Sequence, residues 1–464
     1  MAKARHSQYQ LLIKAVLLVL LLVDLSWSCL QYHHQPIGGD LTALVLPDAR
    51  NATILEEPFG FKAIFEGERY VGTNRYFAHK SLAVYFKTVP FWIQHFVSPM
   101  ESIYLSATLL KMAVHLGYIL LLSCYILGGI ARQPLAFLGT LLFCSALFQA
   151  YGYYDTIGVI AGSPTYLSFY GIPILLFLFF LWPFYRSYQL DDYQWSWHRY
   201  ALLCPLILYL PFSGPLVAPL VLLSSPLVLF ALRKKLGIAQ NILLVALWFL
   251  CLYSFYLGQF NAENQQALAY PEALRRMGSA VLFLLSSKLG LPLILSFLLI
   301  NAGLLYRQRQ FLLQDQWLFL GLALVLFVYL MALPLGGYRD YRPNILRHDT
   351  LIPVTLGLFW ALGRSCWYIL PLLKSYRRAI YLSAIGLFLI IFTLADFNGL
   401  HANACERNLL QQLSQSTAEV VSLPATCPLW AWGLTISPEQ SETTGKLLFF
   451  WGIVDREVRF VQGE

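Results

Sequence analysis

Charged residues are scarce in this chain. They account for 12% of its 464 residues, against 58% for hydrophobic residues, whereas a soluble protein has about 25% charged residues. An ordinary soluble domain is therefore excluded. Basic tracts interleaved with aromatic residues are also lacking, so the formal net charge of +8 does not indicate nucleic-acid binding. The composition predicts an all-α polytopic membrane protein that is embedded in the lipid bilayer.

Several motifs of soluble enzymes are absent as well. The sequence has no P-loop, no HExxH motif and no GxSxG motif, so nothing supports ATP hydrolysis, zincin proteolysis or serine-hydrolase chemistry. No CxxC pair is present, so neither a zinc site nor a redox pair is indicated. The sequence identifies no cofactor with certainty and leaves a divalent metal ion open.

Long apolar runs dominate what is present. A helix needs about 20 apolar residues to cross a bilayer, and the sequence offers eleven candidate runs. They lie near 11–30, 101–129, 134–151, 167–186, 200–214, 216–232, 238–259, 283–305, 316–335, 350–372 and 379–395. Prolines interrupt the pair 200–214 and 216–232, which favours a broken or re-entrant hairpin. The first run has a basic flank and no small-residue cleavage site, so we interpret it as a retained signal anchor.

The distribution of lysine and arginine predicts the orientation. These residues gather at the N-terminus and in alternate short connections, such as 233–235 and 374–378, and such connections are usually cytoplasmic. The outer side then receives the segments 31–100, 152–166, 260–282, 336–349 and 396–464. We expect a transmembrane domain of residues 1–395 and a small outer cap of residues 396–464. The N-terminus is expected in the cytoplasm and the C-terminus outside a bacterial inner membrane.

The first outer segment, 31–100, is predicted to be folded. Apolar residues between Leu82 and Val97 recur at helical spacing, which is typical of an amphipathic helix at the membrane interface, here bent at Pro90. Ser98, Pro99 and Glu101 then match the pattern of a capping box at the start of the next helix. We therefore expect interfacial helices that form a platform for polar residues.

Asp40 is the principal catalytic candidate. It follows Gly38 and Gly39 just beyond the outer end of the first span, where glycines allow a tight turn and close approach to a ligand. A carboxylate there is placed to take a proton from an acceptor hydroxyl. The alternative is an Asx turn that closes the loop.

The first span and the C-terminal tail contain further notable residues. Asp24 lies inside the first span, where a charge is functional by default, or it is paired with Lys111 or Lys288. Cys405 and Cys427 in the tail form a disulfide if the tail faces an oxidising compartment.

The outer loop 336–349 is the second centre of interest. Its candidate substrate-binding residues are Tyr338, Arg339, Arg342, Arg347 and His348. Arginines on the outer side run against the positive-inside trend, and planar guanidinium groups bind phosphate in bidentate fashion. Tyrosine rings here are of the kind that stack on sugars. The alternative is local ion pairing with Asp340 and Asp349.

Other polar residues of the outer segments complement Asp40 as substrate-binding candidates. They are Arg75, His79, Asp155 and Lys288. Lys288 either reaches the outer interface along its apolar stem or points to a lipid phosphate. For each of the four, a structural role is the alternative.

With these residues in place, the chain resembles the GT-C superfamily of membrane glycosyltransferases. The resemblance lies in a cytoplasmic N-terminus, many spans, a long first outer loop with interfacial helices, and an acidic residue early in that loop, here Asp40. Many members have an acidic pair there, whereas this chain has a lone Asp40, with Glu56 and Glu57 well downstream. The resemblance implies transfer of a sugar from a polyprenyl-phosphate donor to a glycan, lipid or protein acceptor at the outer face.

The resemblance also implies roles for individual residues. Asp40 would activate the acceptor hydroxyl for direct displacement at the anomeric carbon. Arg339, Arg342 and Arg347, with Lys288, would neutralise the leaving phosphate, which is an electrostatic contribution of the kind that dominates such reactions.

Two other functions fit the composition. A transporter or flippase for a lipid-linked glycan would use Asp24, Lys111 and Lys288 along an intramembrane path, but no inverted repeat is evident. A non-catalytic assembly subunit would leave the outer arginines without a ligand.

Overall fold

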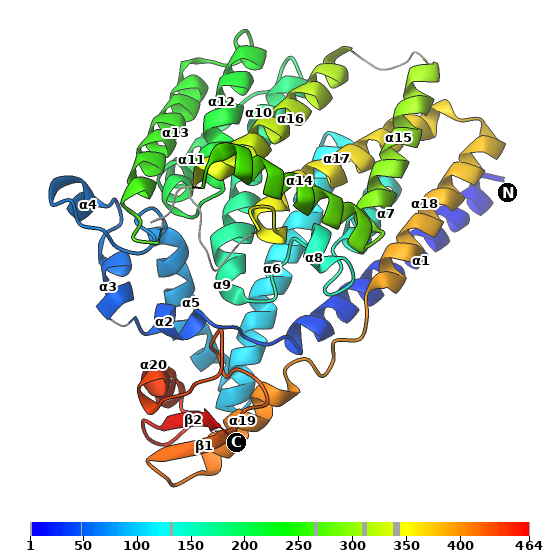
Figure 1. Ribbon diagram of the computed structural model, residues 1–464. Helices are drawn as coiled ribbons and strands as arrows, with labels where there is room; N and C mark the ends of the chain where they lie inside the picture. The colour runs from blue at the N-terminus through cyan, green and yellow to red at the C-terminus, as the bar shows by residue number, and fades with distance from the viewer. Residues whose placement is uncertain are drawn as a thin grey trace.

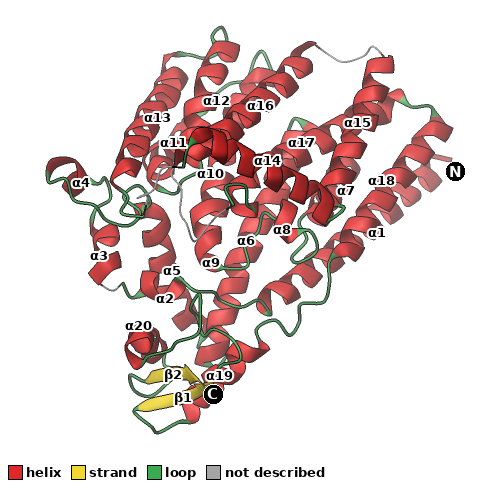
Figure 2. Cartoon of the chain, in the orientation of Figure 1, coloured by secondary structure: helices red, strands yellow, loops and turns green. Residues whose placement is uncertain are grey.

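The structure is a computed structural model that describes residues 2–47, 49–129, 133–263, 268–308, 313–336 and 344–463. Helices make up most of it, and Figure 2 shows one small sheet near the C-terminus. Each apolar helix satisfies its backbone hydrogen bonds within itself, as the interior of a bilayer requires. The described residues thus form an all-α protein suited to a membrane.

Seven helices of the described residues are long and apolar enough to cross a membrane. They are Gln8–His33, Pro99–Leu127, Pro164–Gln189, Ile238–Phe260, Gly290–Arg307, Asp315–Leu335 and Ser375–Ala395. Two shorter apolar helices cover Pro134–Leu147 and Val217–Leu232. The predicted total of eleven spans stays a prediction.

Helix α6 (Pro99–Leu127) lies at the centre of the helical bundle. Its contacts include α1 (Ala2–His33), α5 (Tyr76–Ile93), α7 (Pro134–Leu147), α10 (Ile172–Gln189) and α17 (His348–Leu372). Half of the residues in the most apolar 18-residue stretch of α6 are buried, against 11% in the corresponding stretch of α1. The outward residues of α1 are leucines, isoleucines and valines, as expected for a helix that faces lipid.

The other helices of the bundle pack around this centre. They are α11 (Trp197–Tyr209), α12 (Val217–Leu232), α13 (Ile238–Leu257), α14 (Tyr270–Ser287), α15 (Gly290–Gln308), α16 (Leu313–Ala332) and α18 (Ser375–Ala395). A 3-10 turn at Leu210–Phe212 separates α11 from α12. Proline removes backbone donors, and the expected interruption of 200–232 is confirmed there.

The first outer segment is helical, as predicted. It contains α2 (Leu41–Val45), α3 (Ala49–Glu56), α4 (Phe61–Phe65) and α5, with Pro90 inside α5. The second outer segment has α8 (Tyr154–Ile157) and α9 (Pro164–Tyr166), and α9 runs through a π-helical turn at Leu167–Gly171 into α10. In Figure 1, α2, α3 and α5 lie at the end of the bundle that meets the C-terminal elements.

The start of α6 matches the sequence pattern in part. Ser98 is the N-cap, its Oγ accepts the backbone N–H of Glu101 at 3.4 Å, and Pro99 is the first helical residue. The Glu101 carboxylate, however, binds Arg407 and His33. The second half of the predicted capping box is thus replaced by a long-range ion pair.

Residues 396–463 form the cap. It contains α19 (Ala404–Gln415), β1 (Val420–Pro424), α20 (Glu442–Phe450) and β2 (Arg459–Gly463), with β1 parallel to β2. Short 3-10 turns cover Gly258–Phe260 and Leu333–Gly336 in the bundle and Pro438–Ser441 in the cap. Trp430 and Trp451 of the cap are buried in a core that is continuous with that of the bundle, and the expected disulfide between Cys405 and Cys427 is present.

The cap docks on the first outer segment. Trp451 donates from Nε1 to the carbonyl of Phe86 at 2.9 Å, and Gln94 donates from Nε2 to the carbonyl of Trp451 at 2.9 Å. Phe91 and Phe450 pack edge to face. Figure 1 shows the cap at one end of the bundle, beside the ends of α1 and α6.

Candidate functional site

Asp40 lies where the cap meets the end of α1. It is half-buried and forms the N-cap of α2, but its side chain does not cap the helix. Asp40 Oδ1 instead accepts the Nε1–H of Trp432 at 2.6 Å. Trp432, a cap residue 392 positions away in the sequence, therefore orients the carboxylate. A local Asx turn, the alternative considered from the sequence, needs no such distant partner.

The two glycines before Asp40 are needed for this approach. Gly38 has φ +83°, a conformation that glycine adopts without steric cost. A Cβ on Gly39 would lie 2.8 Å from atoms of the Trp432 ring. The pair thus lets the backbone turn directly beneath the indole.

Trp432 joins Asp40 to the second outer segment. Its ring is 60% exposed, and its centroid lies 5.5 Å from that of Tyr166. On the other side of the loop, a Cβ on Gly38 would meet Ser163 at 3.1 Å. Aromatic faces that are open to solvent and adjoin a carboxylate suit a ligand with both apolar and hydroxyl-bearing faces.

The second outer segment also contacts the start of α17. Tyr154 Oη lies 2.9 Å from His348 Nε2, and the two rings are 4.5 Å apart at their centroids. The backbone N–H of Gly162 approaches the same Tyr154 oxygen at 3.4 Å. Residues 152–166 therefore contact both the Asp40 loop and His348.

Arg347 has a local partner. Its guanidinium donates to both carboxylate oxygens of Asp349, at 3.0 and 2.7 Å, and the Asp349 side chain is 6% exposed. This is the local ion pair that the sequence allowed as the alternative to phosphate binding. The other candidates of this loop, Tyr338, Arg339 and Arg342, lie outside the described residues.

Lys288 and Asp155 are brought together. Lys288 Nζ lies 3.4 Å from Asp155 Oδ2 and donates to the carbonyl of Gly152 at 2.9 Å. Asp155 is largely exposed, whereas the Lys288 side chain is 34% exposed. Both therefore belong to the rim of the second outer segment, on the side of Tyr154.

Arg75 and His79 lie at the start of α5. His79 is buried, its ring stacks 4.4 Å from Phe169, and its Nδ1 lies 2.8 Å from the carbonyl oxygen of Arg75. Burial lowers the pKa of His79 to about 3, because a charged imidazole loses its hydration there. This environment favours the structural alternative for His79, and its role in substrate binding stays a prediction.

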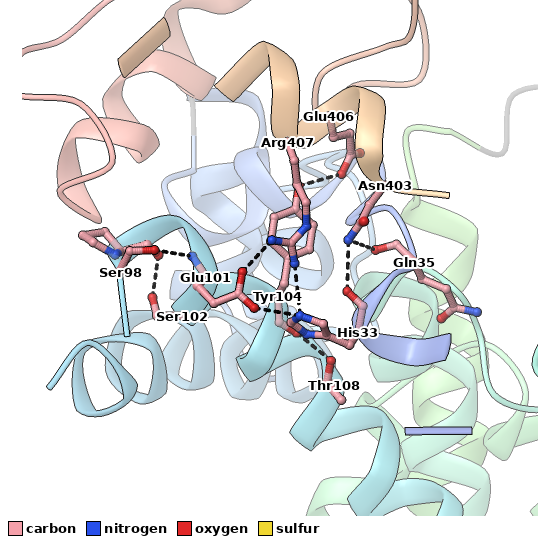
Figure 3. A network of polar contacts seen from close by, with 11 residues as sticks. His33, Gln35, Ser98, Glu101, Ser102, Tyr104, Thr108, Asn403, Glu406 and Arg407 are labelled. Atoms are coloured by element: carbon pink, nitrogen blue, oxygen red, sulfur yellow. Dashed lines mark hydrogen bonds and ion pairs between the residues drawn. The ribbon is translucent and has the colours of Figure 1, made fainter. Parts of the chain in front are cut away.

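Sequence reasoning missed a buried polar cluster that joins the cap to α6. Glu406 Oε2 accepts the backbone N–H of Ile37 at 3.1 Å and the hydroxyl of Tyr104 at 3.2 Å. Lys111, fully buried, donates from Nζ to Gln35 Oε1 at 2.8 Å. Figure 3 shows how Glu406 and Arg407 of α19 point toward the end of α1. No spacing pattern predicts these pairs, because their partners are far apart in the sequence.

A second set of polar contacts lines the inner side of α1. Asp24 accepts a hydrogen bond from Ser145, and Tyr32 Oη lies 3.2 Å from His115 Nδ1. Asp396 accepts the backbone N–H groups of Tyr151 and Gly152 at 2.7 and 2.8 Å. The observed partner of Asp24 is thus a serine, and neither lysine considered from the sequence fills that position.

Nothing in the described ranges groups three or more His, Cys, Asp or Glu side chains in a way that could hold a metal ion. Comparisons with protein-family models, with curated proteins and with solved structures returned no match. A function for this protein must therefore be inferred from the geometry of the chain itself.

Proposed function

We propose that this protein is a membrane glycosyltransferase of the GT-C type, which moves a sugar from a polyprenyl-phosphate donor to an acceptor at the outer face of the membrane. The observation that supports this most is the contact between Asp40 and Trp432. It combines a half-buried carboxylate with an exposed aromatic ring and the neighbouring Tyr166. A base and a sugar-binding surface adjoin one another in such an arrangement.

In this proposal, Asp40 takes the proton of the acceptor hydroxyl while the anomeric carbon is attacked. General bases contribute roughly 10²–10⁴-fold to a rate. The aromatic faces of Trp432 and Tyr166 hold the sugar, and His348 with Tyr154 borders the site on the α17 side. Arg339 and Arg342 neutralise the leaving phosphate, whereas the guanidinium of Arg347 is already paired with Asp349.

The topology completes the proposal. In the proposed topology, the chain has eleven spans, a cytoplasmic N-terminus and an outer cap, and Asp40 faces the outer side of a bacterial inner membrane. The disulfide between Cys405 and Cys427 supports an outer location for the cap, because such bonds persist in oxidising compartments. The acceptor is a glycan, a lipid or a protein.

The test is transfer by the purified protein in lipid nanodiscs. A panel of polyprenyl-phosphate sugars is offered with a detergent-soluble polyprenol or peptide acceptor, with and without EDTA, and products are identified by mass spectrometry. The expected result is transfer from one donor with inversion at the anomeric carbon. Intact donors throughout the panel, with every acceptor, would contradict the proposal.

A transporter for a lipid-linked glycan is the second candidate. The observation in its favour is the polar lining of α1, where Asp24, Gln31 and Tyr32 all have inward partners. Buried polar groups within membrane spans mark substrate or proton paths. Translocation of a fluorescent lipid-linked glycan across proteoliposomes, without chemical change, would favour this candidate over transfer.

A further inference from the structure

The segment that leads to Asp40 has no regular secondary structure. Residues 34–40 connect the end of α1 with the start of α2. Their backbone is held by the first turns of α19, because Glu406 accepts the N–H of Ile37 across 369 positions of sequence. Asn403, the N-cap of α19, donates from Nδ2 to the carbonyls of His33 and Gln35 at 3.0 and 3.5 Å.

Helix α6 holds the same segment from the other side. Tyr104 donates its hydroxyl to the Glu406 oxygen that Ile37 uses, and Lys111 donates to the side chain of Gln35. Glu406 is 5% exposed and Lys111 is fully buried. A buried carboxylate with satisfied hydrogen bonds restrains its partners strongly, because breaking them leaves polar groups without water.

This restraint reaches Asp40 through a short stretch of backbone. Only Gly38 and Gly39 separate Ile37 from Asp40, and glycines bring no side chain of their own to pack. Ile37 and Leu41, on either side, are fully buried. The position of the Asp40 carboxylate thus depends on the buried Ile37 and Leu41 and on the contact with Trp432.

We propose that Glu406 is a positioning residue for Asp40: from the cap, it fixes the backbone of Ile37 and thereby the carboxylate beyond it. This inference rests on the proposed function, in which Asp40 is the base. It also couples the activity of the membrane domain to docking of the cap, since α19 belongs to the cap (Figure 1).

The charges around Glu406 make this coupling sensitive to pH. Tyr104 and Lys111 face it from α6, and Arg407 lies over the Tyr104 ring at 4.0 Å while binding Glu101, which also pairs with His33 of α1. Burial raises the pKa of Glu406 from 4.5 to about 7. The docked carboxyl therefore binds a proton more tightly than the undocked one.

The direction of the pH effect follows from linkage. A raised pKa means that docking is strongest below pH 4.5 and weakens as the pH rises through 7, by on the order of 100-fold in the docking equilibrium. A protonated Glu406 keeps Oε2 as an acceptor for Ile37 and Tyr104. Glutamine reproduces this neutral state, whereas alanine removes the acceptor.

Hydrogen exchange tests the inference without any substrate. Amide exchange of the peptide covering residues 34–41 is followed by mass spectrometry in nanodiscs from pH 6 to 8.5, with correction for intrinsic rates. We expect wild-type protection to fall about tenfold between pH 6 and 7.5 and to change little above that, Glu406→Gln to stay protected throughout, and Glu406→Ala to exchange at least about tenfold faster at every pH. Glu419→Gln, an exposed carboxyl of the cap, serves as the control and should match the wild type.

Kinetics provide the second arm. Glu406→Ala should lower kcat with little change in KM, and Glu406→Gln should retain transfer at pH 7.5, where the wild type has declined from its rate at pH 6. Wild-type protection of residues 34–41 in Glu406→Ala would overturn the inference. If protection is lost in that variant but the wild type transfers no sugar, positioning by Glu406 stands and the proposed transferase function is what fails.

Discussion

Four acidic side chains show that the neighbours of a carboxylate decide what it can do. Asp349 is neutralised by Arg347, Asp24 binds Ser145, and Glu406 is buried. Asp40 alone among the four is half-buried beside an exposed aromatic ring. Sequence position suggested Asp40 as the base, and the geometry supports that choice over the other three.

The Trp432 indole offers a direct test of this environment. Trp432→Phe keeps a ring beside Tyr166 but removes the N–H that Asp40 accepts. We expect kcat to fall about tenfold, or ~1.4 kcal/mol, because a hydrogen bond to a charged group is lost. Steady-state kinetics measure this, with Trp197→Phe as the control, since Trp197 is also exposed. Equal losses in both variants would contradict the assignment.

Because His79 is buried, we expect the stability of the folded protein to depend on pH. Its pKa is lowered to about 3 by burial, whereas an unfolded histidine titrates near 6.5. The stability it supports is complete above pH 6.5 and is lost as the pH falls toward 3, by about 3 kcal/mol at pH 4.5. His79→Asn removes this titration.

Unfolding of the detergent-solubilised protein at pH 7 and 4.5 measures the effect. The wild type should lose more stability than His79→Asn over this interval. An identical loss in both proteins would show that His79 is not buried in its neutral form.

At the scale of single elements, local patterns predicted much of the structure. The apolar spacing of α5 and the Ser98–Pro99 start of α6 were confirmed, since they depend on neighbours in sequence. The partner of Glu101 was missed, because Arg407 comes from a helix more than 300 residues away. The limits of β2 at Arg459–Gly463 are set by its pairing with β1, which comes from a distant part of the sequence.

We expect the disulfide between Cys405 and Cys427 to stabilise the cap, to which α19 belongs. Cys405 and Cys427 are separated by 22 residues, and closing a loop of that length contributes about 3 kcal/mol. We expect Cys405→Ser with Cys427→Ser to destabilise the cap by about this amount and to raise its protease sensitivity. Limited proteolysis of the oxidised wild type and the double variant measures this. A cap that resists protease equally in both would contradict the prediction.

At the scale of the whole molecule, segments from three parts of the chain meet at one end of the bundle. They are residues 35–40, residues 152–166 and the cap (Figure 1). Composition predicted the membrane helices, and the outer position of the polar segments stays a prediction. Which segments would meet was not predictable, because Trp432 and Tyr166 carry no local signal of their partners.

Orientation is tested with reporters on the full chain. Alkaline phosphatase fused at the C-terminus should be active if the cap lies outside, as we propose. The same enzyme inserted beside Lys234 should be inactive, since a basic loop is expected in the cytoplasm. Green fluorescent protein at the two sites should give the opposite pattern. Phosphatase activity only at the Lys234 site would show that the orientation is the reverse of the expected one.

The central claim is that Asp40 is the base of a sugar transfer, and one comparison tests it most directly. Wild type, Asp40→Asn and the control Asp191→Asn, whose carboxylate is exposed beside Lys235, are assayed in nanodiscs with the donor identified from the panel. We predict that Asp40→Asn lowers kcat by roughly 10²–10⁴-fold, while Asp191→Asn matches the wild type. Full transfer by Asp40→Asn would contradict the claim.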